Sequence, residues 1–232
     1  MNSPLADVLA RPDIWRGDRY APAPLPVMAS GFAALDAELP GGGWPRGALC
    51  ELLADGSGLG EISLLLPALR SVREEGGWSL LIAPPHPLHA PAWATAGADL
   101  AHLAVVSPAS ERDALWAMEQ ALASGAPALV LGWAAHADAR ALRRLQVAAA
   151  GGRSLALLFR PLRAAEDASP APLRLALAAG AEGWFSVHLL KRRGPPPAAP
   201  IELVLPRPAR LRSHGRPLAG HSSAPRSAVV TL

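Results

Sequence analysis

The chain has 232 residues, half of them apolar, which is enough to bury the core of one α/β domain with further terminal segments. Charged residues make up 18% of the sequence, the net charge is +3, and no apolar run is long enough to cross a membrane. The first 20 residues have no apolar stretch typical of a secretion signal, so we expect a cytoplasmic protein. A single cysteine, Cys50, excludes an internal disulfide and a cysteine-rich metal site, and we expect it in the core.

Residues 1–29 form an N-terminal segment that ends in a proline-rich linker. Trp15 stands beside Arg16 in a polar, proline-flanked stretch, and an isolated aromatic of this kind is a frequent anchor at protein interfaces. We expect this segment to dock either on a partner or on the chain's own domain, and the sequence does not choose between them.

From residue 30, short apolar runs alternate with helical patterns. The apolar runs cover 48–53, 78–83, 103–106, 128–131 and 154–159, and the helical patterns cover 61–75, 89–97, 110–124 and 137–150. Buried strands that alternate with helices predict a doubly wound, mainly parallel sheet. Residues 184–192 and 201–205 predict an antiparallel hairpin that closes one edge, so the core domain spans 30–205.

The C-terminal segment is basic. Between Leu203 and Leu232 there are five arginines and no acidic residue. Residues 206–232 show no periodicity and are predicted to be disordered. Arg207, Arg210 and Arg212 are candidate partner-binding residues, with improved solubility as the alternative explanation.

A loop between the first apolar run and the first long helix has the position of a phosphate-binding loop. Such a loop requires a lysine after its last glycine and then a serine or threonine for magnesium, but Glu61 and Ile62 occupy these places, and the one lysine is Lys191. A carboxylate about 4 Å from a phosphate charge is repelled by roughly 4 kcal/mol at an effective dielectric near 20. We therefore predict a degenerate nucleotide loop formed by Asp55, Gly56, Ser57, Gly58, Gly60 and Glu61.

The sequence contains features for and against residual nucleotide binding. The loop glycines keep their backbone amides available, and a helix N-terminus attracts anions without a lysine. Glu61 already compensates the helix dipole in the first turn, so we expect a structural loop, no cofactor and no bound ATP.

The order of elements and several short segments resemble the RecA core and, more closely, the ImuA family. ImuA proteins are RecA-like, SulA-related members of bacterial mutagenic translesion-synthesis cassettes. The matching segments are Trp15-Arg16-Gly17, Ser30-Gly31-Phe32, Leu39-Pro40-Gly41-Gly42-Gly43-Trp44-Pro45, Leu142-Arg143-Arg144-Leu145-Gln146, Phe159-Arg160-Pro161 and Leu190-Lys191-Arg192-Arg193-Gly194. The resemblance implies a RecA-like fold over about residues 30–205.

The same resemblance shows what an active recombinase would have and this chain lacks. Pro85 stands where an acid would activate water, and Gly132-Trp133 follows the strand that would end in a magnesium-binding aspartate. Phe159-Arg160-Pro161 covers the region of the γ-phosphate sensor. Because phosphoryl transfer depends on placed charges, we predict no catalytic residues and no ATP hydrolysis.

Two groups of basic residues are candidates for sequence-independent binding of single-stranded DNA. Arg140, Arg143 and Arg144 share one helix face, opposite Leu142, Leu145 and Ala149. The RecA resemblance adds Arg153, Arg160 and Arg163, and a second cluster contains Lys191, Arg192 and Arg193. The alternative is a solvated helix face and ordinary edge-strand charges. The seven histidines show no metal-ligand spacing, so no metal site is expected.

By resemblance, the expected function is that of a non-catalytic accessory protein of SOS-induced translesion synthesis. It would bridge an ImuB-type partner, an inactive Y-family relative, with RecA or DNA, and act indirectly on an error-prone DnaE-type polymerase at the nucleoid. The alternative is a SulA-like inhibitor of cell division that binds FtsZ. A third possibility, an active recombinase, conflicts with the missing loop lysine.

Overall fold

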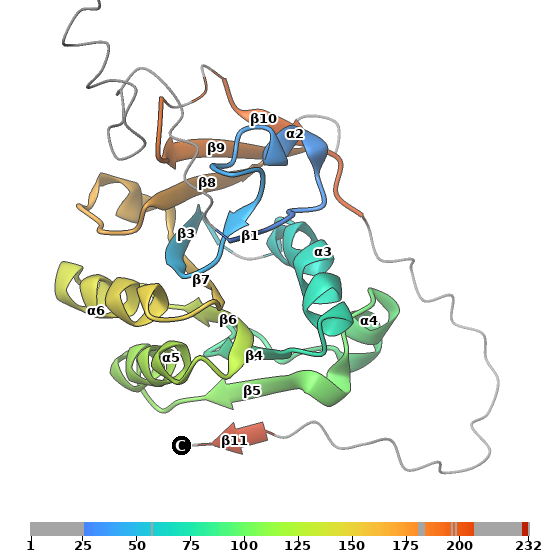
Figure 1. The fold of residues 1–232 in the computed structure, drawn as a ribbon, viewed down its shortest axis with the longest axis vertical. Helices are drawn as coiled ribbons and strands as arrows, with labels where there is room; N and C mark the ends of the chain where they lie inside the picture. The colour runs from blue at the N-terminus through green and yellow to red at the C-terminus, as the bar shows by residue number, and fades with distance from the viewer. Residues whose placement is uncertain are drawn as a thin grey trace, which may run out of the picture.

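The computed structural model describes residues 26–56, 58–180, 184–195, 197, 199–206 and 229–231. Within these residues, nine strands form one sheet in the order β10-β9-β8-β3-β7-β6-β4-β5-β11 (Figure 1). The sheet strands are β3 (Ala48–Ala54), β4 (Trp78–Ile82), β5 (Leu103–Ser107), β6 (Pro127–Trp133), β7 (Leu155–Pro161), β8 (Leu173–Ala179), β9 (Phe185–Lys191), β10 (Ile201–Leu203) and β11 (Val229–Thr231). A small separate sheet of two antiparallel strands pairs β1 (Val27–Met28) with β2 (Trp44–Pro45).

Helices cover both faces of the sheet (Figure 1). One face carries α3 (Glu61–Glu74) and α4 (Ala90–Thr95), and the other carries α5 (Glu111–Ser124) and α6 (Ala139–Ala150). The remaining helical elements are α2 (Ala33–Asp36), η1 (Leu100–His102) and η2 (Leu162–Glu166). The predicted doubly wound, mainly parallel architecture is confirmed. The five strands β3, β4, β5, β6 and β7 pair in parallel with their neighbours, and helices lie on both sides.

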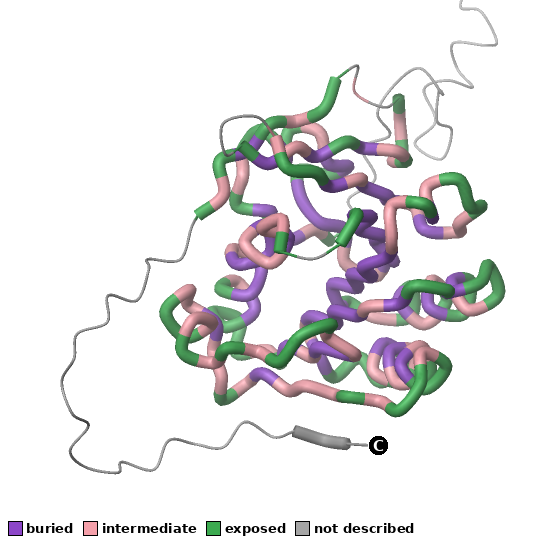
Figure 2. The backbone as a smooth tube through the Cα atoms, turned by 180° about the vertical axis from the view of Figure 1, so that it is seen from behind, coloured by how far each residue is buried: buried purple, intermediate pink, exposed green. Residues whose placement is uncertain are grey.

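The core has two parts because successive strand residues point to opposite faces. Cys50 and Leu52 of β3 join the cluster that contains α3, whereas Leu49 joins the cluster with α5 and α6. Figure 2 shows buried residues concentrated along α3 and the central strands. Cys50 is fully buried as expected, and this burial raises the pKa of its thiol far above the usual range, which leaves the thiol protonated.

At the start of each of the helices α5 and α6, a capping side chain accepts a hydrogen bond from a backbone amide of the first turn. The Ser110 hydroxyl accepts a hydrogen bond from the Asp113 amide at the start of α5, and the Asp138 carboxylate accepts one from the Ala141 amide at the start of α6. Helix α5 ends at Gly125, whose φ of 65° lies in the left-handed region that favours glycine. The predicted helices agree with the observed ones to within two residues at each end.

The predicted hairpin is confirmed, because β9 pairs antiparallel with both β8 and β10 at one edge. The prediction of disorder for residues 206–232 is wrong at 229–231, because these residues form β11 through backbone pairing with β5. Strand β8 was also not predicted, although it lies directly beside β3 in the sheet. Its sequence, Leu-Arg-Leu-Ala-Leu-Ala-Ala, contains only residues that favour helices, so burial between β3 and β9 overrides its local propensity.

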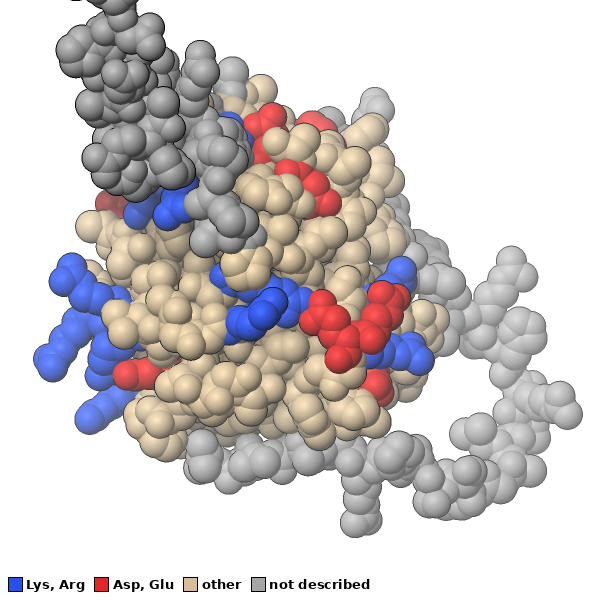
Figure 3. All heavy atoms as spheres, in the orientation of Figure 1, with Lys and Arg blue, Asp and Glu red and all other residues tan. Residues whose placement is uncertain are grey.

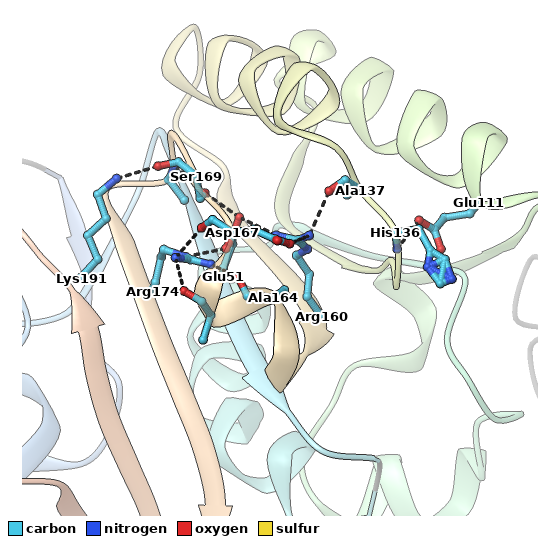
Figure 4. Close-up of polar contacts among 12 residues, drawn as sticks. Glu51, Glu111, His136, Ala137, Arg160, Ala164, Asp167, Ser169, Arg174 and Lys191 are labelled. Atoms are coloured by element: carbon cyan, nitrogen blue, oxygen red, sulfur yellow. Dashed lines mark hydrogen bonds and ion pairs between the residues drawn. The ribbon is translucent and has the colours of Figure 1, made fainter.

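A buried ion network connects β3, β7 and β8 (Figure 4). The Glu51 side chain in β3 is 0% exposed, and its oxygens lie 2.8 Å from Arg174 Nε and 3.6 Å from Arg160 Nη1. Arg160 Nη2 also lies 3.2 Å from Asp167 Oδ2, so two arginines face two carboxylates. The Ser169 hydroxyl donates a 2.7 Å hydrogen bond to Glu51, which further satisfies the buried charge.

Replacing Glu51 tests this network. Glu51→Ala leaves two buried guanidinium groups without their shared carboxylate, so we expect the free energy of unfolding to fall by about 3–5 kcal/mol. Chemical denaturation of the wild type and the variant measures the difference. The exposed acid Glu74 provides the control, since Glu74→Ala should change stability by no more than about 0.5 kcal/mol. Equal effects of the two substitutions would contradict the role of the network.

In the described part of the chain, no helix combines the length and apolar character that a membrane crossing requires.

Candidate functional site

The candidate site lies at the carboxyl ends of the parallel strands, where ligands of open α/β sheets usually bind. The loop of residues 55–60 joins β3 to α3 there, and the segments after β4, β6 and β7 lie around it. Gly60 is the N-cap of α3 with a φ of 104°, a backbone conformation that favours glycine. A Cβ atom at this position would also lie 3.1 Å from Leu205 Cδ1, which leaves little space for a larger residue.

The Glu61 carboxylate binds the amides of its own loop. Its Oε1 accepts a hydrogen bond of 3.0 Å from the Gly58 amide, and its Oε2 accepts one of 3.0 Å from the Gly60 amide. The residue is 7% exposed, so this carboxylate is largely enclosed. Amides at the start of a helix are the donors that hold phosphate in a phosphate-binding loop. The side chain of Glu61 therefore occupies the donors that an anionic ligand would need.

A second pair of amides at the same edge is also bound by a side chain. Glu111 at the start of α5 accepts hydrogen bonds of 2.9 Å from the Ala135 amide and 2.7 Å from the His136 amide (Figure 4). These amides belong to the segment that follows β6. In both loops, therefore, a pair of backbone amides donates hydrogen bonds to a carboxylate of the same chain.

The cavity beside the loop is mainly apolar. It has a volume of about 270 Å³ and is lined by Ala54, Gly56, Glu61, Pro85, Trp133, Ala134, Ala135, Phe159, Arg160 and Pro161. The Trp133 and Phe159 rings stack with centroids 5.3 Å apart and an interplanar angle of 17°. A neighbouring cavity of about 130 Å³ shares Glu61, Pro85 and Trp133 and adds Ile62 and Trp93. Aromatic and proline side chains thus form much of the wall of the two cavities beside the loop.

The residues that replace the catalytic groups of a recombinase in the sequence lie in or near the wall of this cavity. Pro85 and Trp133 line it, and Gly132 belongs to β6, where a Cβ atom would lie 2.8 Å from Met118 Sδ. Among the lining residues, the acid is Glu61, and both of its oxygens are engaged by loop amides. The described residues contain no group of three His, Cys, Asp or Glu side chains placed to hold a metal ion.

The other predicted loop residues are partly described. Asp55, Gly56 and Gly58 are exposed, and Ser57 lies outside the described residues. The candidate partner-binding residues, Trp15, Arg16, Arg207, Arg210 and Arg212, also lie outside them.

The basic face predicted on α6 is present in the structure. Arg140, Arg143 and Arg144 are exposed, whereas Leu142, Leu145 and Ala149 are buried against the sheet and α5. Lys and Arg side chains gather over α6 at the left edge of Figure 3. Arg144 Nε lies 3.2 Å from Glu119 Oε2 on α5, so part of this charge is compensated. Arg153 and Arg163 are exposed as well.

Two of the predicted DNA-contacting arginines are instead structural. The Arg160 side chain is 2% exposed, and it binds Glu51, Asp167 and the Ala137 carbonyl. The Arg192 side chain is 7% exposed, and its Nη1 lies 2.7 Å from Glu38 Oε2 and also donates to the Glu38 carbonyl. Sequence position could not reveal this, because Glu51 and Glu38 are each more than 100 residues away from the arginine that they bind.

The remaining members of that cluster stay at the surface. Lys191 is exposed, and its Nζ donates a 2.7 Å hydrogen bond to the Ser169 carbonyl. Arg193 is exposed. The second basic cluster therefore presents two cations rather than three.

Comparison with known proteins finds sequence similarity to SulA and to RecA. The family model named Cell division inhibitor SulA matches residues 49–156, from β3 to β7. The SulA proteins of Edwardsiella piscicida and Photorhabdus laumondii subsp. laumondii are 38% identical over 101 residues and 33% identical over 111 residues. Protein RecA of Chlorobaculum parvum is 32% identical over 115 residues. The chain is therefore similar in sequence to SulA over residues 49–156 and to RecA over a stretch of 115 residues.

The similarity covers only parts of these proteins. The two SulA matches cover 43% and 48% of this chain and 60% and 63% of the relatives. The RecA match covers 50% of this chain and 33% of the relative. Strands β8, β9 and β10 lie after the segment that the SulA model matches.

Replacing Glu61 tests whether its carboxylate stands in for an anion. Glu61→Ser removes two hydrogen bonds to a charged acceptor, so we expect a loss of about 1–3 kcal/mol in the free energy of unfolding. Millimolar pyrophosphate should restore part of this stability in the variant, because the freed amides can then bind it, and should leave the wild type unchanged. Thermal unfolding with and without pyrophosphate measures both effects.

The control for this experiment is Glu74→Ser, which removes an exposed acid from the other end of α3. It should show neither the loss nor the pyrophosphate effect. Equal stabilisation of all three proteins by pyrophosphate, or no destabilisation of Glu61→Ser, would contradict the assigned role.

Proposed function

We propose that this chain is a non-catalytic, RecA-like accessory protein of the bacterial DNA damage response that acts by binding other macromolecules. In this proposal it works in SOS-induced mutagenic translesion synthesis, where it bridges an ImuB-type partner with RecA or single-stranded DNA. An error-prone DnaE-type polymerase is reached indirectly, through the ImuB-type partner.

The observation that carries the proposal is the Glu61 carboxylate on the Gly58 and Gly60 amides. It takes up donors that a nucleotide would use and adds negative charge where a triphosphate would need positive charge. The recombinase-like sheet and its flanking helices are nevertheless intact. A retained scaffold with a closed nucleotide loop favours a binding role over ATP hydrolysis, without ATP or magnesium as a cofactor.

Two surfaces support a role in binding macromolecules. The apolar cavity with the stacked Trp133 and Phe159 rings suits an apolar side chain of a protein partner. The exposed arginines of α6 suit phosphates of single-stranded DNA. The two surfaces lie on different elements, so both partners could bind at once.

A second candidate function is inhibition of cell division through FtsZ. It is favoured by the SulA family model over residues 49–156 and by the identity to two proteins named cell division inhibitor SulA. The two proposals share a protein-binding, nucleotide-independent mode of action and differ in the partner.

Affinity capture from DNA-damaged cells distinguishes the two proposals. We expect the tagged chain to recover an ImuB-type protein, with or without magnesium and ATP in the buffer, because the scaffold needs no nucleotide. Quantitative mass spectrometry against an untagged culture measures the recovery. Recovery of FtsZ without an ImuB-type protein would favour the alternative, and recovery that depends on ATP would contradict both.

Binding to DNA is tested by the triple variant Arg140→Ala, Arg143→Ala and Arg144→Ala. Each lost phosphate contact on single-stranded DNA lowers the slope of log affinity against log salt concentration by about 0.7, so the triple variant should lose about 2. Fluorescence anisotropy with a labelled oligonucleotide at several salt concentrations measures the slope. Arg73→Ala on α3, on the opposite face of the sheet, is the control and should leave it unchanged. An unchanged slope in the triple variant would exclude α6 as the DNA-binding surface.

A further inference from the structure

Strand β5 carries a short strand from a distant part of the chain on its outer side. β11 pairs with β5 in parallel, with Val229 opposite Val105, Val230 opposite Val106 and Thr231 opposite Ser107 (Figure 1). In the described part of the chain, this pairing places β11 at the edge of the sheet, beyond β5. The 22 residues between Pro206 and Val229 connect it to the core.

An apolar groove runs beside this edge. It has a volume of about 430 Å³ and is lined by Leu103, Val105 and Ser107 of β5, by Leu100, and by residues 84–88 and 90. Leu103, Val105 and Ser107 are alternate residues, so the groove flanks one face of β5. In the register, positions 229 and 231 are the partners of Val105 and Ser107, two of the strand residues that line the groove.

Strand β5 is less buried than the strands inside the sheet. Ala104, Val105 and Val106 are half-buried, whereas all seven residues of β3 are buried (Figure 2). Without β11, β5 would be the edge strand, and an edge strand presents unpaired backbone amides and carbonyls that can pair with an added strand. Backbone pairing combined with a groove for alternate side chains is the geometry by which sheets bind extended peptides.

We propose that the β5 edge and its groove form a docking surface for an extended segment in parallel orientation, and that residues 229–231 of the same molecule occupy it. The pairing involves three residues in the described part of the chain, and closing the connection of 22 residues has an entropic cost. The occupant is therefore exchangeable, and a partner that adds a strand at this edge must displace it. This inference is independent of whether the partner is of the ImuB or the FtsZ type.

A disulfide between paired positions tests the register and the source of the strand. Val106 and Val230 are partners in the parallel ladder, and the Cα atoms of such partners lie within the separation that a disulfide tolerates. The double variant Val106→Cys with Val230→Cys should therefore cross-link within one molecule under mild oxidation. Cys50 is fully buried with a protonated thiol and should not interfere. Non-reducing electrophoresis and peptide mass spectrometry identify the link and the molecular mass.

The control is Val106→Cys with Thr231→Cys, which places the thiols on opposite faces of the sheet and should cross-link about tenfold more slowly. Equal cross-linking of both pairs, or none in the first, would overturn the proposed register. Covalent dimers from the first pair would show that a second copy supplies the strand and would overturn the intramolecular part.

Exchange of backbone amide hydrogens provides a second readout on the natural side chains of β5. In a variant that ends at residue 225, the amides of β5 that face β11 should exchange about tenfold faster, whereas those of β6 should not change. A synthetic peptide of residues 226–232 should restore the protection in the shortened chain, and the same peptide with Val230→Pro should not, because proline lacks the amide that the ladder requires. Unchanged exchange of β5 after shortening, or equal restoration by both peptides, would refute the docking surface.

Discussion

One carboxylate occupies two amide donors of the loop at the candidate site. Glu61 begins α3, and both of its oxygens accept amide hydrogens of the loop that precedes the helix. In phosphate-binding loops, amides before a helix and the positive end of the helix dipole attract phosphate. Here the carboxylate that accepts from these amides belongs to the chain itself. Glu111 satisfies a second pair of amides at the same edge, which leaves an apolar cavity between the two loops.

The rest of the core is stabilised independently of a ligand. The strands beside the loop are held by apolar packing on both faces and by the buried network of Glu51, Arg160, Asp167 and Arg174. Buried charges are tolerated when each has a partner, and here two positive groups face two negative groups. The proposed loss of phosphate chemistry would therefore leave these core contacts in place.

The sequence predicted most of the fold because the parallel strands are short apolar runs separated by clear helical patterns. Strand β8 was missed, since its leucines and alanines favour a helix and only its neighbours β3 and β9 make it a strand. At the site, the missing lysine and the acid at Glu61 could be seen in the sequence, but the two hydrogen bonds of that acid could not. Arg160 and Arg192 were wrongly assigned to DNA contact, because charge alone does not distinguish a surface cation from one buried against a distant carboxylate.

The most direct test of this account is a crystal structure of the chain grown with magnesium and a non-hydrolysable ATP analogue. The account predicts that the Glu61 carboxylate remains on the Gly58 and Gly60 amides and that no triphosphate density appears above the start of α3. An ordered triphosphate on those amides, with Glu61 turned away, would contradict it.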